Sequence, residues 1–174
     1  TELRALDDVH AGAKLIRDQR IPRECVPTQW LAYPAVWDAL LGAMPMTALI
    51  RNLATMTRVG LLTSCSDATK RVVAQLGDRQ RLARARIHPL AVLSALVTYR
   101  SGRGVRGSGE WKPVAAIVDA LDSAFYATFD AVEPTGKRTL LALDVSGSMA
   151  SGAVGGVANL SPRVASAAMA LVTA

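Results

Sequence analysis

The chain has 174 residues, of which 51% are hydrophobic, and its 20 Lys and Arg against 14 Asp and Glu give a formal charge of +6. This length and hydrophobic content suffice to bury a core, which excludes a disordered tail. No apolar stretch approaches the roughly 20 residues that cross a bilayer, and the polar start Thr1–Glu2–Leu3–Arg4 is not a secretory signal, so we expect a folded, soluble protein.

The charge and the cysteines indicate a partner and a compartment. Arginine supplies most of the positive excess, and its guanidinium forms paired hydrogen bonds with phosphates, so we expect a nucleic-acid partner. The alternative is that the charge only keeps the surface solvated. Cys25 and Cys65 are too few and too isolated for a disulfide framework or a zinc site, which favours a reduced, cytoplasmic setting.

Two apolar stripes flank Pro45. The first stripe predicts a helix that stops before this proline and consists of Trp37, Leu40, Leu41 and Met44. The second predicts a helix with Pro45 in its first turn and consists of Met46, Leu49, Ile50 and Leu53. Because Arg51 and Asn52 lie off the centre of the second stripe, we expect them to face a partner such as an RNA phosphate, although a helix–helix contact is the alternative.

Local signals mark further helices along the chain. Ser66 is a candidate N-cap for a helix that Gly77 would end in the left-handed conformation, and Asp78 can cap the next segment. That segment, residues 79–86, carries four arginines and is either a solvated helix, which we favour slightly, or a phosphate-facing one.

Two prolines open the last of these helices. Pro89 and Pro113 each precede an apolar stripe at helical spacing, and His88 is better explained as a turn or capping residue than as a ligand. Between these helices, residues 101–109 form a basic, glycine-rich loop that is not a P-loop and is either a surface connection or a phosphate cradle. The succession of two-faced helices predicts a mostly α protein in which helix pairs stack as an α-solenoid, with a compact bundle as the alternative.

The periodicity changes after the turn Glu133–Pro134–Thr135–Gly136, so we place a domain boundary there, between residues 1–134 and 135–174. The apolar run Arg138–Asp144 predicts a buried strand, and the residues after Pro162 predict a helix that covers one face of its sheet. Only about thirty residues follow this strand, whereas a parallel α/β domain needs several strands. We therefore expect the chain to end inside a truncated α/β domain.

Asp144, Ser146 and Ser148 follow the predicted strand in the order Asp-x-Ser-x-Ser. Carboxylate and hydroxyl oxygens at the carboxyl end of a strand suit a Mg²⁺-like divalent cation, so these three residues are candidate metal ligands in an incomplete site. An enzymatic alternative makes Asp144 a phosphoryl-accepting nucleophile. Enzymes of that kind usually carry a second Asp two residues later, where this chain has Ser146, so we expect no catalysis.

Several motifs, in this order, resemble the Ro autoantigen family: Val36–Leu41, Met44–Leu53, Met56–Thr57, Ala85–Pro89 and Glu133–Arg138. The Asp-x-Ser-x-Ser motif likewise resembles the metal-ion-dependent adhesion site of von Willebrand factor A domains. Members of the Ro family carry a TROVE module followed by such a domain, and the resemblance implies a ring of HEAT-like helix pairs closed by the A domain.

The resemblance also implies a function. Family members bind small noncoding Y RNAs on the outer surface of the ring and the single-stranded ends of misfolded RNAs in its hole, and bacterial members work with an exoribonuclease. It therefore implies an RNA-binding scaffold in noncoding-RNA quality control. A protein-docking platform, in which the divalent cation bridges to a partner's carboxylate, is the alternative.

The family's RNA-contacting residues carry over in part. Arg23–Thr28 resembles the Arg-Glu-His segment that contributes to Y RNA binding, but Cys25 stands where a His is usual, and a neutral thiol cannot donate two hydrogen bonds to phosphate. Lys14, Arg17 and Arg20 lie upstream at helical spacing and would form a positive face beside Arg23. A solvated helix face is the alternative for these residues.

Overall fold

The computed structural model describes residues 8–104, 109–133, 136–157 and 160–173, and the elements in these ranges are helical. The α-helices are α1 (Val9–Gln19), α2 (Pro34–Leu41), α3 (Met46–Arg58), α4 (Asp67–Leu76), α5 (Arg79–Arg84), α6 (Pro89–Ser101), α7 (Ala115–Ala127) and α8 (Pro162–Thr173). Short 3₁₀ turns lie at η2 (Arg23–Cys25), η3 (Thr28–Ala32), η4 (Phe129–Ala131) and η5 (Gly147–Ala150). The predicted mostly α class is confirmed. None of the described helices is long and apolar enough to cross a membrane.

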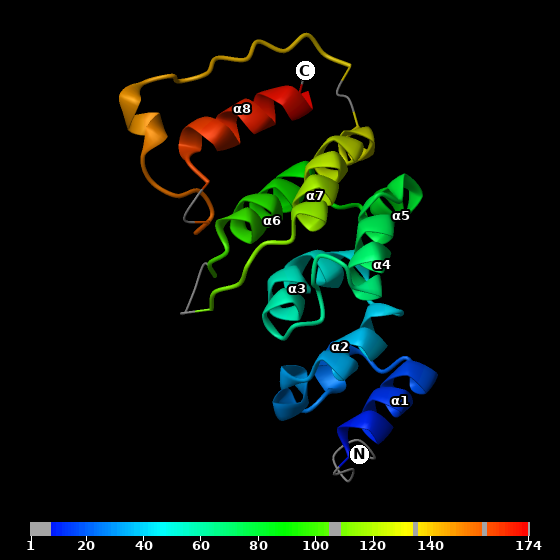
Figure 1. Ribbon diagram of the computed structural model, residues 1–174. Coiled ribbons are helices and arrows are strands. Elements are labelled where there is room, and N and C mark those ends of the chain that lie inside the picture. The colour runs from blue at the N-terminus through cyan, green and yellow to red at the C-terminus, as the bar shows by residue number, and fades with distance from the viewer. Residues whose placement is uncertain (1–7, 105–108, 134–135, 158–159, 174) are drawn as a thin grey trace.

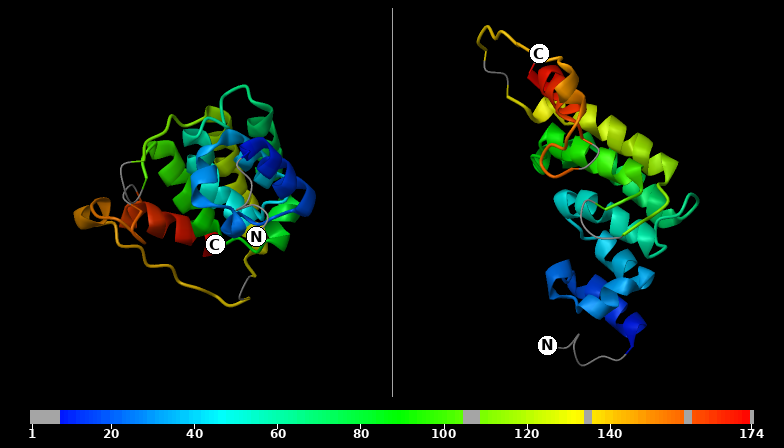
Figure 2. Two further views of the ribbon diagram at one scale, coloured as in Figure 1. Left: turned by 90° about the horizontal axis from the view of Figure 1, so that it is seen from below. Right: turned by 90° about the vertical axis from the view of Figure 1, so that its left-hand side faces the viewer.

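The helices stack along one axis, with α1 at one end and α8 at the other (Figures 1 and 2). Helix α1 packs on α2, α2 contacts α3, and α3 packs on α6. Helix α7 lies between α6 and α4, and α8 contacts α6. Neighbouring helices therefore bury each other's apolar stripes. That these layers are HEAT-like pairs of a solenoid stays a prediction.

The buried core runs through these layers and includes Trp30 and Trp37, with Trp111 packed against it. Trp37, predicted as a core residue, is completely buried, and its indole N–H donates to the carbonyl of Leu31 at 2.8 Å. Trp30 is also buried and lies against Gly12 of α1, whereas Trp111 is half-buried and donates to the Tyr99 carbonyl at 3.0 Å. The three tryptophan rings thus serve packing.

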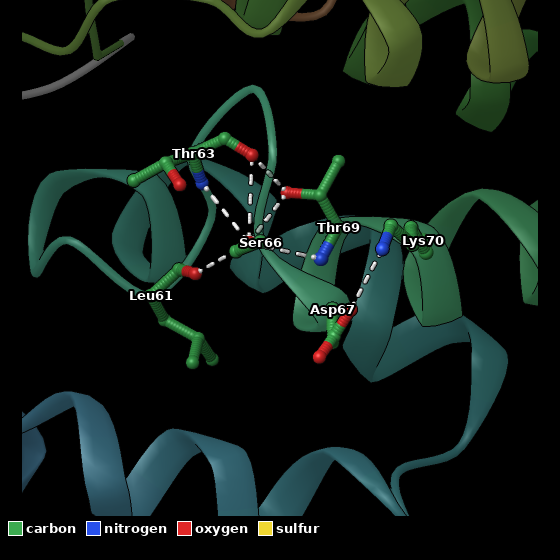
Figure 3. Close-up of polar contacts among 6 residues, drawn as sticks. All are labelled: Leu61, Thr63, Ser66, Asp67, Thr69 and Lys70. Atoms are coloured by element: carbon green, nitrogen blue, oxygen red, sulfur yellow. Dashed lines mark hydrogen bonds and ion pairs between the residues drawn. The ribbon is translucent and has the colours of Figure 1, made fainter.

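The predicted helix caps at Ser66 and Asp78 are confirmed. Ser66 Oγ accepts the backbone N–H groups of Thr69 and Thr63 at 3.2 and 3.3 Å and lies 3.0 Å from the Leu61 carbonyl oxygen, which ties the start of α4 to the preceding turn (Figure 3). Asp78 Oδ1 accepts the N–H of Arg81 at 3.0 Å and so caps α5. Each cap satisfies a backbone donor that a helix leaves unpaired.

Gly77 corrects one prediction. It ends α4 with φ of −79°, in the right-handed region, and its N–H donates to the Val73 carbonyl at 3.0 Å. The expected left-handed turn is absent because Asp78 caps α5 immediately, so the chain passes from one helix into the next without a left-handed residue.

The predicted helix starts at Pro45 and Pro113 are one and two residues too early, since α3 begins at Met46 and α7 at Ala115.

The predicted strand Arg138–Asp144 was wrong for this chain. These residues are exposed, with Leu140 93% exposed, and residues 139–145 make no backbone hydrogen bond with another described segment. A strand needs a neighbour to satisfy its backbone groups, and the described residues place none beside it. The helix predicted after Pro162 is confirmed as α8, but it lies against α6 and η5 and does not cover a sheet.

Candidate nucleic-acid interface

Helix α1 and the turn after it present four basic residues to solvent. Asp8 caps α1 by accepting the N–H of His10 at 2.8 Å, and the helix turns Ile16 into the core. The opposite side of the helix then carries exposed basic residues, and the turn adds two more. We call Lys14, Arg17, Arg20 and Arg23 together the α1 basic surface, and all four side chains are exposed.

Three of these residues border adjoining hollows between α1 and the end of α2. A hollow of about 450 Å³ is lined by Arg17 of α1, by Arg20 directly after α1, and by small residues at the end of α2 and just beyond it. A second hollow, of about 200 Å³, is lined by Arg20, Arg23 and the acidic Glu24, together with apolar residues that include those around Pro45. Because Arg20 borders both hollows, the exposed residues Arg17, Arg20 and Arg23 lie around two adjoining hollows. Lys14 lies on the same helix but borders neither hollow.

A fifth basic residue joins this surface from a distant part of the chain. Asp38 of α2 accepts hydrogen bonds from Arg17, at 3.1 Å between Nη2 and Oδ2, and from Arg71 of α4. One carboxylate thus holds two guanidinium groups at the surface and leaves a net positive charge. Each guanidinium has five N–H donors, so both keep donors free for a phosphate. Sequence reasoning missed Arg71 because nothing local separates it from other helix-surface arginines.

Arg23 and Cys25 lie in the short turn η2. The guanidinium carbon of Arg23 lies 5.8 Å from the centroid of the Trp37 ring, close enough for a cation–π contact that orients the charge. Cys25 is an exposed free thiol in the same turn. The structure therefore places Cys25 beside the α1 basic surface, where it contributes no charged donor of its own.

Arg51 and Asn52 do not act as a pair. Arg51 is exposed and lines a separate groove of about 350 Å³ between α3 and α6. Asn52 is half-buried, and its amide Nδ2 donates to the Ala48 carbonyl at 2.8 Å, one turn earlier in the same helix. The structure thus favours Arg51 for contact with a partner and gives Asn52 a role within α3.

The four arginines of residues 79–86 divide between two roles. Arg79 forms an exposed ion pair with Asp130 at 3.4 Å, and Arg81 Nη2 donates to the Met44 carbonyl at 3.0 Å, just beyond the end of α2. Arg84 and Arg86 are exposed, and their side chains make no hydrogen bond or ion pair with another described residue. Two of the four arginines therefore contact other parts of the chain.

The loop at residues 101–109 lies partly outside the described residues.

Asp144, Ser146 and Ser148 do come together. Asp144 Oδ1 accepts the N–H of Ser146 at 2.8 Å, and the hydroxyl oxygens of Ser146 and Ser148 lie 2.9 Å apart. Hydrogen bonds to the Asp144 carboxyl from the backbone and the side chain of Ser146 lower its pKa below the ordinary value, so this carboxyl is charged at neutral pH. Three hard oxygen donors on an exposed turn are the kind of ligand set that Mg²⁺ takes.

These features define a class of protein: stacked helices that carry an arginine-bordered depression on one surface. Comparison with known proteins narrows this class. The TROVE domain family matches residues 3–98. The RNA-binding protein RO60 of Deinococcus radiodurans is 47% identical over 163 residues, which are 93% of this chain and 30% of that protein. The protein of the same name from Caenorhabditis elegans is 45% identical over an alignment of 161 residues, which covers 85% of this chain and 25% of that protein.

A solved structure supports the same assignment. The crystal structure of the Deinococcus radiodurans RO (RSR) protein matches with a TM-score of 0.87 at 45% identity, over 99% of this chain and 34% of that chain. The chain therefore belongs to the Ro family and carries its TROVE domain. It spans about a third or less of the length of these relatives.

Proposed function

We propose that this chain is an RNA-binding scaffold that holds small noncoding, Y-like RNAs on the α1 basic surface. The observation that carries this proposal is the group of exposed arginines Arg17, Arg20 and Arg23 around two adjoining hollows, to which Asp38 adds Arg71. Guanidinium groups in a row match the phosphates of an RNA backbone, and the RNA-binding names of two relatives point to the same partner.

The geometry favours backbone recognition over base reading at this surface. Phosphate contacts give affinity and register without sequence information. The tryptophans that could stack on bases are buried or half-buried, so they are not available as stacking platforms here. The α1 basic surface should therefore bind structured RNA with modest sequence preference.

The cellular role extends this proposal. We propose that the intact protein also binds the single-stranded ends of misfolded RNAs, and that it acts in cytoplasmic RNA quality control beside an exoribonuclease partner. The chain itself would catalyse nothing, since Ser146 stands where a phosphoryl-transfer site would need a second carboxylate.

We further propose that residues 135–174 begin a von Willebrand factor A domain. Asp144, Ser146 and Ser148 would hold a divalent cation in it, and the close approach of their oxygens supports this assignment. Such a cation supplies a positive charge that can bind a carboxylate. A protein-docking role for the intact domain is therefore the second candidate function, with the remaining ligands supplied by residues outside this chain.

A binding experiment tests the RNA proposal. The probe is a fluorescent RNA stem with a single-stranded 3′ tail, titrated with the chain at several salt concentrations. Affinity should fall as salt rises, and the double variant Arg17→Gln/Arg20→Gln should make the slope shallower by roughly 1.4–1.8, because each lost phosphate contact removes about 0.7–0.9. Arg79→Gln, whose guanidinium already pairs with Asp130, is the matched control and should change little.

Two results would contradict the proposal. One is binding that does not depend on salt. The other is an equal slope for the wild-type chain and the double variant, because the RNA would then be held elsewhere.

A further inference from the structure

An apolar groove lies between α3 and α6. It has a volume of about 350 Å³ and is open to solvent along the seam of the two helices. Its apolar wall includes Ile50 and Ala54 from α3 and Ile87 from the turn before α6. No other described part of the chain lines it, so its apolar wall is left without a partner.

The α6 side keeps the groove open because its residues are small. Ala91 and Ala95 lie one turn apart on this side, and Ala91 is exposed. Larger side chains at these positions would close the seam by packing against α3. The opening is therefore a property of side-chain size and does not require either helix to move.

Few polar groups line the groove, and the one charge among them is positive. Arg51 is the only charged residue among those that line it, and its side chain makes no ion pair or hydrogen bond with another described residue. The hydroxyl groups of Thr47 and Thr98 also line it and make no hydrogen bond with another described residue. The groove thus offers an apolar slot, two free hydroxyls and one cation, with no carboxylate among its lining residues.

One ligand class carries the complement of all three features in a single unit. A nucleotide of single-stranded RNA has a flat base with little charge, polar groups on the edge of that base, and an anionic phosphate next to it. An amphipathic peptide helix would also fill an apolar groove, but it would pair with Arg51 only if it carried an acidic residue at one particular position, whereas every nucleotide carries a phosphate. The charge of the groove therefore favours the nucleotide.

We propose that the α3–α6 groove binds one unstacked base of single-stranded RNA, and that Arg51 pairs with the adjacent phosphate. The base lies against Ile50 and Ala95, with its edge toward the hydroxyls of Thr47 and Thr98. This site rests on the proposed RNA-binding function and gives it a base-contacting part that the α1 basic surface lacks.

The test compares intact and abasic single strands on the full chain. The probe is a fluorescent ten-nucleotide RNA, with a matched strand in which the central riboses lack bases but all phosphates remain. The wild-type chain should bind the abasic strand about tenfold more weakly, a loss of about 1.4 kcal/mol that burial of one base against aliphatic side chains can supply. Ala91→Leu should fill the groove and remove this difference. Ala116→Leu, at an exposed alanine of α7, is the matched control and should retain it.

Arg51→Gln tests the contribution of the Arg51 charge separately from base binding in the groove. It should weaken both strands and make the salt dependence shallower while retaining the preference for the intact strand. Thermal unfolding of each variant shows whether it is folded. If Ala91→Leu does not fold, Thr98→Val provides a second variant, which should reduce the preference without changing the volume of the groove.

The outcomes separate this proposal from the function it rests on. Equal affinity of the wild-type chain for intact and abasic strands would overturn the base site, even if the stem probe still binds through the α1 basic surface. Displacement of the single strand by an uncharged amphipathic helical peptide, with Ala91→Leu blocking that peptide, would assign the groove to a protein partner and also overturn it. Loss of salt-dependent binding to the stem probe would instead count against RNA binding by the α1 basic surface.

Discussion

Gly12 is expected to be the position at which adding a single methyl group does the most damage. A Cβ atom at Gly12 would lie 1.8 Å from Cζ3 and 2.3 Å from Cη2 of Trp30. Real Cβ atoms do not approach other heavy atoms so closely, so in Gly12→Ala either the Trp30 ring or α1 must shift. Trp30 is 6% exposed and belongs to the core, so the ring cannot move without losing contacts.

Two opposing free energies set the size of the effect. Replacing Gly by Ala inside a helix favours the helix by about 1 kcal/mol. Overpacking a core typically costs about 1–3 kcal/mol, and displacing a tryptophan puts this site at the upper end of that range. The net loss in the free energy of unfolding should be roughly 1–2 kcal/mol. For a chain of this size, each kcal/mol lowers the midpoint temperature by about 2–4 °C.

The assay is denaturant and thermal unfolding followed by circular dichroism, with Gly42→Ala as the control. Gly42 has φ of −61° and nothing within 4 Å of an added Cβ atom, so alanine there should be neutral or slightly stabilising. The double variant Gly12→Ala/Trp30→Leu should lose less than the sum of its single variants, because the smaller side chain removes the clash. If Gly12→Ala were as stable as Gly42→Ala, the packing of α1 against Trp30 described above would be incorrect.

Three further predictions concern a cap, a buried phenol and the cation site. Ser66→Ala should lower the free energy of unfolding by about 1 kcal/mol or somewhat more, measured by urea denaturation, whereas the exposed Ser64→Ala should be neutral. Burial raises the pKa of Tyr99. The contribution of Tyr99 to stability should therefore be constant below about pH 10 and be lost as pH rises through the higher folded-state pKa. Tyr99→Phe should abolish this pH dependence together with the bond to Thr57. Asp144→Ala should remove any Mg²⁺ binding that calorimetry detects in the intact protein.

Each of these predictions has a clear contrary result. Equal stability of Ser66→Ala and Ser64→Ala would show that the cap is unimportant. An alkaline loss of stability that survives Tyr99→Phe would place the titrating group elsewhere. Undiminished Mg²⁺ binding by Asp144→Ala would remove the support for a cation at the Asp-x-Ser-x-Ser motif.

Local chemistry made several elements predictable. The caps at Ser66 and Asp78 follow from side chains that bond their own helix a few residues on, and His88 likewise accepts the N–H of Leu90 at 3.2 Å. Such contacts lie within one turn of helix, so the residues that make them are close in the sequence. The mostly α class followed from the same short-range periodicity.

Longer-range features were less predictable. The run Arg138–Asp144 has the composition of a strand, but a strand exists only where a second segment pairs with it, and the described residues provide none. Asn52 looked as available as Arg51 until the helix placed the Asn52 amide on the Ala48 carbonyl. In both cases the outcome depends on a second group in the folded structure, and amino-acid composition does not specify that group.

The amino-acid sequence alone determined the helical class, the positions of two caps, the family resemblance and the basic character of α1. The tertiary structure decided which arginines form one surface, by bringing Arg71 of α4 to Asp38 of α2, and it created the groove beside Arg51 from two helices about forty residues apart in the sequence. The reason is that side-chain propensities act over a few residues, whereas a binding surface depends on how separate helices pack against each other.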